Sequence, residues 1–147
     1  MKKIFALCIF ALFTAGAFAN IPTAVNEKVL KAFRETFTTA QQITWHESTE
    51  NYSVRFLQEG IKYIVYYNKD GVITNSMRFY APALLPMNIL KEIKNHYSKK
   101  TAFGVTEITS GEDVAYFVRM EDEKHWYTIK FTPSGEALEY EKLKKQL

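Results

Sequence analysis

Cysteine is almost absent from this sequence, since the only one, Cys8, lies in an apolar run near the N-terminus. Motifs of catalysis are missing as well: the chain has no GxSxG nucleophile elbow, no phosphate-binding P-loop and no cysteine beyond residue 8 that could act with a histidine. These absences exclude a disulfide framework and favour a protein that is not an enzyme. Its stability then has to come from buried side chains and backbone hydrogen bonds alone.

Metal-ligand spacing is also lacking. The three histidines, His46, His96 and His125, show none of the HxH, HxxxH or HExxH spacings that bring two ligands together on one element. We therefore expect surface histidines, no metal site and no cofactor. The acidic run over residues 121–123 flanks a predicted hairpin turn, where solvated carboxylates are common.

A strong charge of either sign is missing too. The formal net charge is +3, and it falls to +1 when Lys2 and Lys3 are removed, because residues 1–19 contain no acid. A nearly neutral protein has no electrostatic reason to bind nucleic acid or an anionic membrane. We therefore expect neither as a partner.

The first nineteen residues have the three parts of a secretory signal peptide. They are a basic start at Lys2 and Lys3, an apolar run over residues 4–13 and the small-x-small site Ala17-Phe18-Ala19. The apolar run is shorter than the ~20 residues that a membrane-spanning helix needs. We expect cleavage after Ala19, no membrane insertion afterwards and a periplasmic or secreted mature protein.

What the sequence does contain is an internal repeat of about sixty residues, a period typical of structural duplication. Apolar residues recur at helical spacing at Val25, Val29, Leu30, Phe33 and Phe37, and again at Leu85, Ile89, Leu90, Ile93 and Tyr97. Further along, Tyr52, Val54, Arg55, Tyr63 and Gly71 align with Tyr116, Val118, Arg119, Tyr127 and Gly135, once a short insertion over residues 110–113 is allowed. We expect a first repeat over residues 20–81 and a second over residues 82–147, within one compact domain.

Each repeat is predicted to form one helix followed by four antiparallel strands. The first helix is expected over residues 23–37 with Thr23 as its cap, and its strands over residues 43–47, 52–58, 61–67 and 72–80. The second helix restarts after Pro82, with Pro86 near its first turn, where a missing N–H does no harm. Its strands are expected over residues 103–109, 114–121, 125–131 and 137–143. The pattern predicts an α+β fold made of two tandem α-β4 repeats.

Side-chain alternation separates two faces of the predicted sheet. If Gln58 pairs with Ile61 across the turn, one face is apolar and should lie under the helices: Tyr52, Val54, Phe56, Tyr63, Val65 and Tyr67, then Tyr116, Val118, Met120, Tyr127, Ile129 and Phe131. The opposite face is mixed: Ser53, Arg55, Leu57, Lys62, Ile64 and Tyr66, then Ala115, Phe117, Arg119, Glu121, Trp126, Thr128 and Lys130. Two helices are too few to cover both sides of eight strands, so we expect this second face to be exposed.

The exposed face carries the candidate site. Arginine beside aromatic residues is the composition enriched at binding hot spots, and we select Arg55, Tyr66, Phe117, Arg119 and Trp126 as partner-binding residues. The alternative is an ordinary solvated face, on which a few aromatic residues stabilise cross-strand pairs.

A set of short motifs follows the same order in both repeats. They are Ala32-Phe33, Phe37, Trp45-His46-Glu47, Tyr52-x-Val54-x-Phe56, residues 63–67 and Asp70-Gly71-Val72-Ile73, then Leu85-Pro86, Ile93, Tyr97, Val105, Tyr116-x-Val118, Tyr127-x-Ile129-x-Phe131 and Gly135. In this order they resemble the repeat of the PepSY-like, β-lactamase-inhibitor-like proteins of bacterial periplasms. Two positions depart from it: Thr38 stands where a proline often follows the aromatic residue, and Val105 stands where the first copy has Trp45.

The resemblance implies a curved antiparallel sheet with both helices packed on one side, like that of β-lactamase inhibitory protein. It leaves the concave face available to a protein partner, and it maps no inhibitory loop onto particular residues. A shared fold does not by itself imply inhibition.

We therefore expect a monomeric, non-enzymatic binding module for a protein or peptide of the cell envelope. One alternative is an inhibitor of a periplasmic peptidase or β-lactamase. Another is a small-ligand carrier with a pocket between helix and sheet near Trp45 and His46. Lys142, Lys144 and Lys145 would discourage pairing of the last strand with a second molecule.

Overall fold

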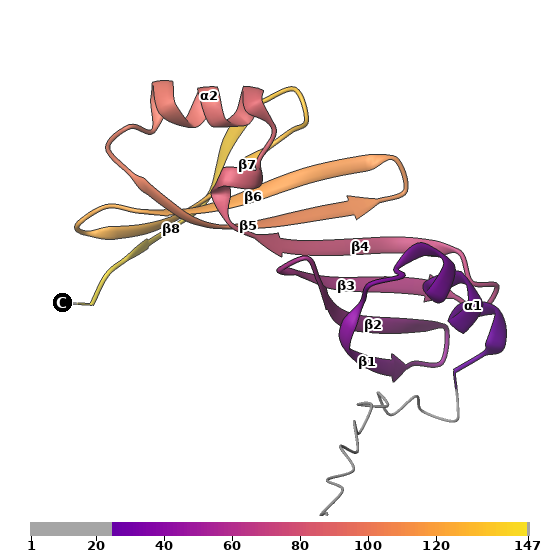
Figure 1. The fold of residues 1–147 in the computed structure, drawn as a ribbon. Coiled ribbons are helices and arrows are strands. Elements are labelled where there is room, and N and C mark those ends of the chain that lie inside the picture. Colours follow the sequence, from indigo (N-terminus) through magenta and orange to yellow (C-terminus); the bar gives the residue numbers. More distant parts are fainter. Residues whose placement is uncertain (1–24, 147) are drawn as a thin grey trace, which may run out of the picture.

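Residues 25–146 are described by the structure, a computed structural model, and the predicted signal peptide and Thr23 cap lie outside them. Two helices are each followed by four antiparallel strands, and each strand pairs with the next along the chain in one open sheet (Figure 1). The elements are α1 (Glu27–Thr36), β1 (Gln41–Glu47), β2 (Asn51–Gln58), β3 (Ile61–Asn68), β4 (Ile73–Tyr80), the 3₁₀ turn η1 (Pro82–Leu84), α2 (Met87–His96), β5 (Thr101–Ser110), β6 (Asp113–Glu121), β7 (His125–Phe131) and β8 (Ala137–Lys144). The predicted α+β fold is confirmed. Across residues 25–146 no helix is long and apolar enough to span a membrane.

Helix α1 begins later than the sequence predicts. Its N-cap is Asn26, whose side-chain oxygen accepts a hydrogen bond from the Lys28 N–H at 2.9 Å, so the helix starts at Glu27 and not near residue 23. An asparagine cap satisfies one of the backbone donors that a helix start leaves free. Helix α2 likewise begins at Met87, with Pro86 at the cap position.

Both helices lie on the same face of the sheet, as the strand register shows. One row of directly paired residues crosses five strands from β3 to β7: Tyr63, Arg78, Glu107, Tyr116 and Phe131. Paired residues of antiparallel strands share a face. At one end of the row the Tyr63 ring lies 5.8 Å from Phe37 at the end of α1, and at the other Phe131 lies 6.0 Å from Tyr97 at the end of α2. The predicted pairing of Gln58 with Ile61 is also present.

Under the two helices lie two hydrophobic clusters of different character. In the first, the Phe33 ring of α1 packs edge-on against Trp45 and Phe56, with both pairs of ring centroids 5.2 Å apart. The second is largely aliphatic and includes Ile89 of α2. Its Val105 is buried at the position where the first repeat has Trp45. The expected apolar face is buried throughout, with Tyr63 and Tyr116 only partly covered.

Each helix is tied to the last hairpin of its own repeat. The Asn26 side chain donates to the Lys69 carbonyl in the β3–β4 turn at 3.1 Å, and Asn88 of α2 donates to the Pro133 carbonyl in the β7–β8 turn at 2.8 Å. Gly71, in the first of these turns, has φ +83°, and a Cβ there would lie 2.9 Å from the Lys28 carbonyl oxygen. The turn can therefore pack on α1 only because this residue is glycine.

A polar cluster joins the two repeats where β4 meets β5. Arg78 Nη1 lies 3.1 Å from Glu107 Oε1, and the Tyr80 hydroxyl donates to Glu107 Oε2 at 2.6 Å. The Arg78 guanidinium also faces the rings of Tyr63 and Tyr80, at 5.7 and 5.4 Å from their centroids. Burial and the bond to Glu107 raise the pKa of Tyr80 above its ordinary value. These contacts link strands of both repeats.

Candidate binding face

The sheet face opposite the helices, which we call the open face, is defined by the strand register. One row across β2–β5 consists of Arg55, Ile64, Met77 and Ile108, and the next, across β2–β8, of Leu57, Lys62, Phe79, Thr106, Phe117, Lys130 and Leu138. Arg55 and Arg119 are exposed, as the sequence predicts for this face. The face therefore presents apolar and cationic side chains together.

A hollow of about 610 Å³ opens on this face. Its lining consists of Gln42, Arg55, Phe56, Leu57, Lys62, Tyr63, Ile64, Phe79 and Arg119. The volume lies within the range of pockets that hold small ligands. Two of the residues selected from the sequence, Arg55 and Arg119, thus border one cavity although they come from different repeats.

Arg119 reaches the hollow because its side chain extends from β6 over β5. β2 and β6 are four strand spacings apart, about 19 Å in a flat sheet at ~4.8 Å per strand. The Arg119 side chain covers part of that distance, because its Nη2 donates to Thr106 Oγ1 on β5 at 3.4 Å. Its direct partner on β5 is Gly104, where a Cβ would meet no atom within 4 Å. A residue without a side chain leaves this path open.

The hollow is lined by three cations and no acid. Arg55, Lys62 and Arg119 all border it, and no aspartate or glutamate is among the lining residues. None of the three takes part in an ion pair within residues 25–146. The lining of the cavity therefore carries a net positive charge.

The other three selected residues lie outside this lining. Tyr66 pairs with Ser53 and Asn75 and is half-buried. Phe117 packs edge-on against Tyr140 of β8, with ring centroids 5.2 Å apart. The structure thus brings together two of the five candidates and leaves three dispersed on the same face.

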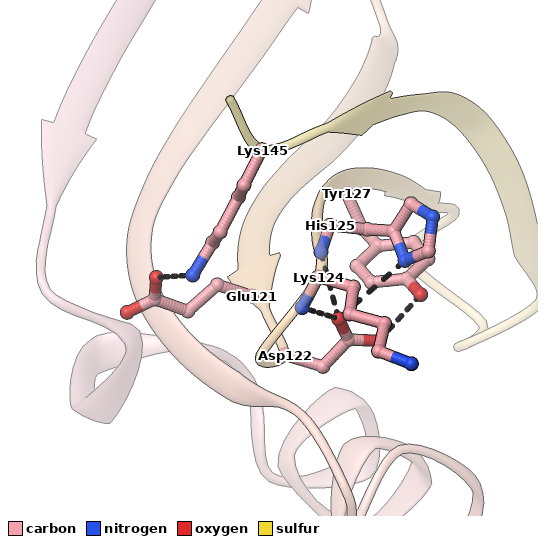
Figure 2. Close-up of polar contacts among 6 residues, drawn as sticks. All are labelled: Glu121, Asp122, Lys124, His125, Tyr127 and Lys145. Atoms are coloured by element: carbon pink, nitrogen blue, oxygen red, sulfur yellow. Dashed lines mark hydrogen bonds and ion pairs between the residues drawn. The ribbon is translucent and has the colours of Figure 1, made fainter. Parts of the chain in front are cut away.

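Trp126 belongs to a separate cluster near the start of β7. Its ring, 42 % exposed, packs edge-on against Phe103 at 5.4 Å, and the Lys145 ammonium lies 4.3 Å from its centroid. Lys145 also pairs with Glu121 Oε2 at 2.7 Å (Figure 2). The cation beside this aromatic pair is therefore already neutralised.

Asp122 organises the neighbouring β6–β7 turn and is not simply solvated, which corrects the expectation for residues 121–123. Its Oδ1 accepts from the backbone N–H groups of Lys124 and His125, both at 2.8 Å, and its Oδ2 accepts from the Tyr127 hydroxyl at 2.6 Å (Figure 2). These bonds, chiefly that from Tyr127, hold the pKa of Asp122 well below its usual range. The same bond raises the pKa of Tyr127 to about 12.

Trp45 and His46, near which a carrier pocket is expected, are not among the residues that line the hollow. Trp45 is buried among the rings under α1, 6.2 Å from the Tyr67 centroid, whereas His46, the next residue of the strand, is exposed. Successive residues of a strand point to opposite faces, so the two side chains lie on different sides of the sheet. In the described part of the chain, no three acidic, histidine or cysteine side chains gather to hold a metal ion.

Sequence reasoning placed Lys62, Leu57 and Ile64 on the correct face but did not select them for the site, and it assigned Phe79 to no face. Alternation alone could have placed Phe79 there. It could not have placed Phe103, because a bulge between Ala102 and Gly104 interrupts the alternation of β5. The bulge lets the Phe103 ring reach Trp126.

Three solved structures from Bacteroides have a similar fold. A BLIP-like protein of Bacteroides fragilis superposes with a TM-score of 0.63 at 14 % identity, covering 81 % of this chain and 85 % of that one. A DUF2874 family protein of Bacteroides uniformis gives 0.61 at 19 % identity, covering 80 % and 88 %. A protein of Bacteroides eggerthii described as "putative periplasmic" gives 0.62 at 19 % identity, covering 82 % and 88 %. No protein-family model and no curated protein matches the chain.

These likenesses show the fold. They agree with the β-lactamase-inhibitor-like architecture inferred from the sequence, and one of the similar proteins carries a periplasmic description. The PepSY part of the resemblance stays a prediction, because none of these structures is described by that name.

Proposed function

We propose that this protein is an exported, non-enzymatic binding module of the cell envelope that holds a protein partner on its open face. The observation that carries the proposal is the hollow that Arg55 of the first repeat and Arg119 of the second border together. A site built from both repeats gives the duplication a role that neither repeat has alone. The signal-peptide pattern of residues 1–19 and the periplasmic description of a similar structure support export.

The chemistry of the face suits binding. Arginine and aromatic residues contribute most to protein interfaces, and an apolar floor with a polar border is their usual anatomy. Here Leu57, Ile64 and Phe79 supply the apolar surface and the arginines the border. We therefore assign recognition to the hollow and treat the cluster around Trp126 as a second contact region.

Affinity capture from an envelope extract tests the proposal. The mature protein is compared with an Arg55→Ala plus Arg119→Ala variant, and with a Lys91→Ala plus Lys94→Ala variant that removes the same charge from α2. A protein retained by the wild type and the α2 variant, and lost with the arginine variant, is the expected result. Retention of the same proteins by all three forms, each shown to be folded by circular dichroism, would reject the open face as the site.

Inhibition is the second candidate, favoured by the likeness to a BLIP-like protein. The partner would then be a periplasmic peptidase or β-lactamase, and the open face would cover part of the enzyme. Unchanged rates of these enzymes at saturating protein would eliminate this candidate and leave the binding module untouched.

A further inference from the structure

We infer that the segment held in the hollow is acidic: a stretch of the partner protein that places aspartate or glutamate beside an apolar residue. This inference rests on the proposed function and names the chemistry of the partner.

The charge of the hollow is concentrated and not a sign of general basicity. Three cations border one cavity, while the mature chain as a whole has a formal charge of only +1. A cleft lined by one sign of charge focuses its field and raises the local concentration of the opposite charge. A carboxylate placed there would relieve the mutual repulsion of Arg55, Lys62 and Arg119.

The geometry suits a carboxylate on a peptide. An arginine guanidinium presents a planar fork of donors that matches the two oxygens of a carboxylate. Arg119 donates one hydrogen bond, to Thr106 at 3.4 Å, and its other N–H groups can meet a carboxylate. Beside the cations lie Leu57, Ile64 and Phe79. An apolar side chain next to the acid would cover this floor, so a segment with both features fits better than an isolated anion.

The rest of the open face offers no equal site for an acid. Near Trp126 the available cation, Lys145, is paired with Glu121 at 2.7 Å. An incoming carboxylate there would compete with a carboxylate already in place. Lys130 lies 5.9 Å from the Phe117 ring and is one cation, whereas the hollow has three. The hollow is therefore the part of this face at which acidic residues of a partner contribute most to binding.

A peptide selection tests the inference. A random capped peptide library is selected against the wild type and against a variant with Arg55→Gln, Lys62→Gln and Arg119→Gln. A third protein, with Lys91→Gln, Lys94→Gln and Lys99→Gln, loses the same charge around α2 and serves as the matched control. The affinity of one selected peptide is then measured for all three proteins, and citrate is titrated as a small polycarboxylate probe.

The expected result is enrichment of aspartate and glutamate beside apolar residues with the wild type and the control. Loss of the three hollow cations should weaken binding of the selected peptide about tenfold or more, since each exposed charge pair contributes a modest factor. Peptides without acids that are selected on the open face would overturn the acidic inference while leaving the binding module intact. Equal acidic enrichment with all three proteins, no enrichment at all, or citrate binding tighter than any peptide would also overturn it.

Discussion

Gly71 illustrates how one residue can be fixed by two constraints at once. Its φ of +83° disfavours any side chain, and a Cβ would lie 2.9 Å from a backbone oxygen of α1. Gly60 has a similar φ of +77°, but a Cβ there would meet nothing within 4 Å. We predict that Gly60→Ala lowers the free energy of unfolding by about 1–2 kcal/mol, the cost of a left-handed backbone. Gly71→Ala should cost about 3 kcal/mol or more in urea unfolding. Equal losses would show that the turn moves away from α1 freely.

Two buried tyrosines should respond in opposite ways to removal of their hydroxyl. The Tyr67 hydroxyl has no hydrogen-bond partner among residues 25–146, and burial raises its pKa to about 12. Tyr67→Phe should therefore leave stability unchanged or raise it by about 1 kcal/mol. Tyr127→Phe should lower it, because the bond to Asp122 is lost. Thermal unfolding of both variants measures the contrast, and a destabilised Tyr67→Phe would point to an unrecognised partner of that hydroxyl.

Asp122 makes the stability of the second repeat depend on pH. Because its pKa is lowered in the folded state, its contribution is present above the ordinary aspartate pKa of ~4 and is lost as the pH falls below that value. Asp122→Asn should thus be less stable than the wild type at pH 7, and the difference in stability should narrow as the pH falls from ~4 towards 2. Urea unfolding curves of both proteins between pH 7 and pH 2 measure this difference. Glu123→Gln removes the same charge from the same turn. Its free energy of unfolding should change with pH in the same way as that of the wild type.

At the scale of elements, Lys145 holds the end of the edge strand β8 against β6 and β7. Its backbone N–H donates to the Lys124 carbonyl at 2.8 Å, and its ammonium contacts Glu121 and Trp126. Lys145→Gln should make β8 amides exchange with solvent about twofold to fivefold faster, the range of a partly exposed ion pair. Amides of β1–β4 should not change, and hydrogen exchange read by NMR resolves the two groups. A uniform acceleration would mean that the contact acts on global unfolding.

The elements themselves follow closely from the sequence. Every predicted strand exists, β7 has the predicted bounds, and the register of β2 with β3 is as inferred, because period-2 alternation and turn residues determine both. The start of α1 was misplaced because Thr23 and Asn26 are both plausible caps, and only the position of the β3–β4 turn, which Asn26 contacts, favours the second. Local pattern carries no information about that contact.

At the scale of the whole molecule, the Arg78–Glu107 pair couples the repeats. Glu107→Leu alone leaves the half-buried Arg78 guanidinium without its carboxylate and should lower the free energy of unfolding by about 2 kcal/mol. Arg78→Met together with Glu107→Leu should recover much of that loss, since replacing both partners by apolar residues is often nearly neutral. A double-mutant cycle in urea measures the coupling. If the loss in the double variant equals the sum of the losses in the two single variants, the pair does not act as a unit.

The candidate site could be predicted only in part. Alternation identified the open face and placed Arg55 and Arg119 on it, but it could not say which residues of that face come together. Which residues meet depends on the twist of the sheet and on how far the Arg119 side chain extends over β5. Both are properties of the assembled sheet. For the same reason Tyr66, Phe117 and Trp126 share the face without sharing the hollow.

The strictly sequential order of the strands has a consequence for how the chain acquires its structure. Each strand pairs with the one made just before it, so no strand has to wait for a distant segment. Chains rich in such local pairings form their native contacts quickly. A polypeptide that emerges N-terminus first, from a ribosome or from a translocation channel, could complete α1 and its four strands while the second repeat is still arriving. The exposed β4 edge would then serve as the template on which β5 is laid down.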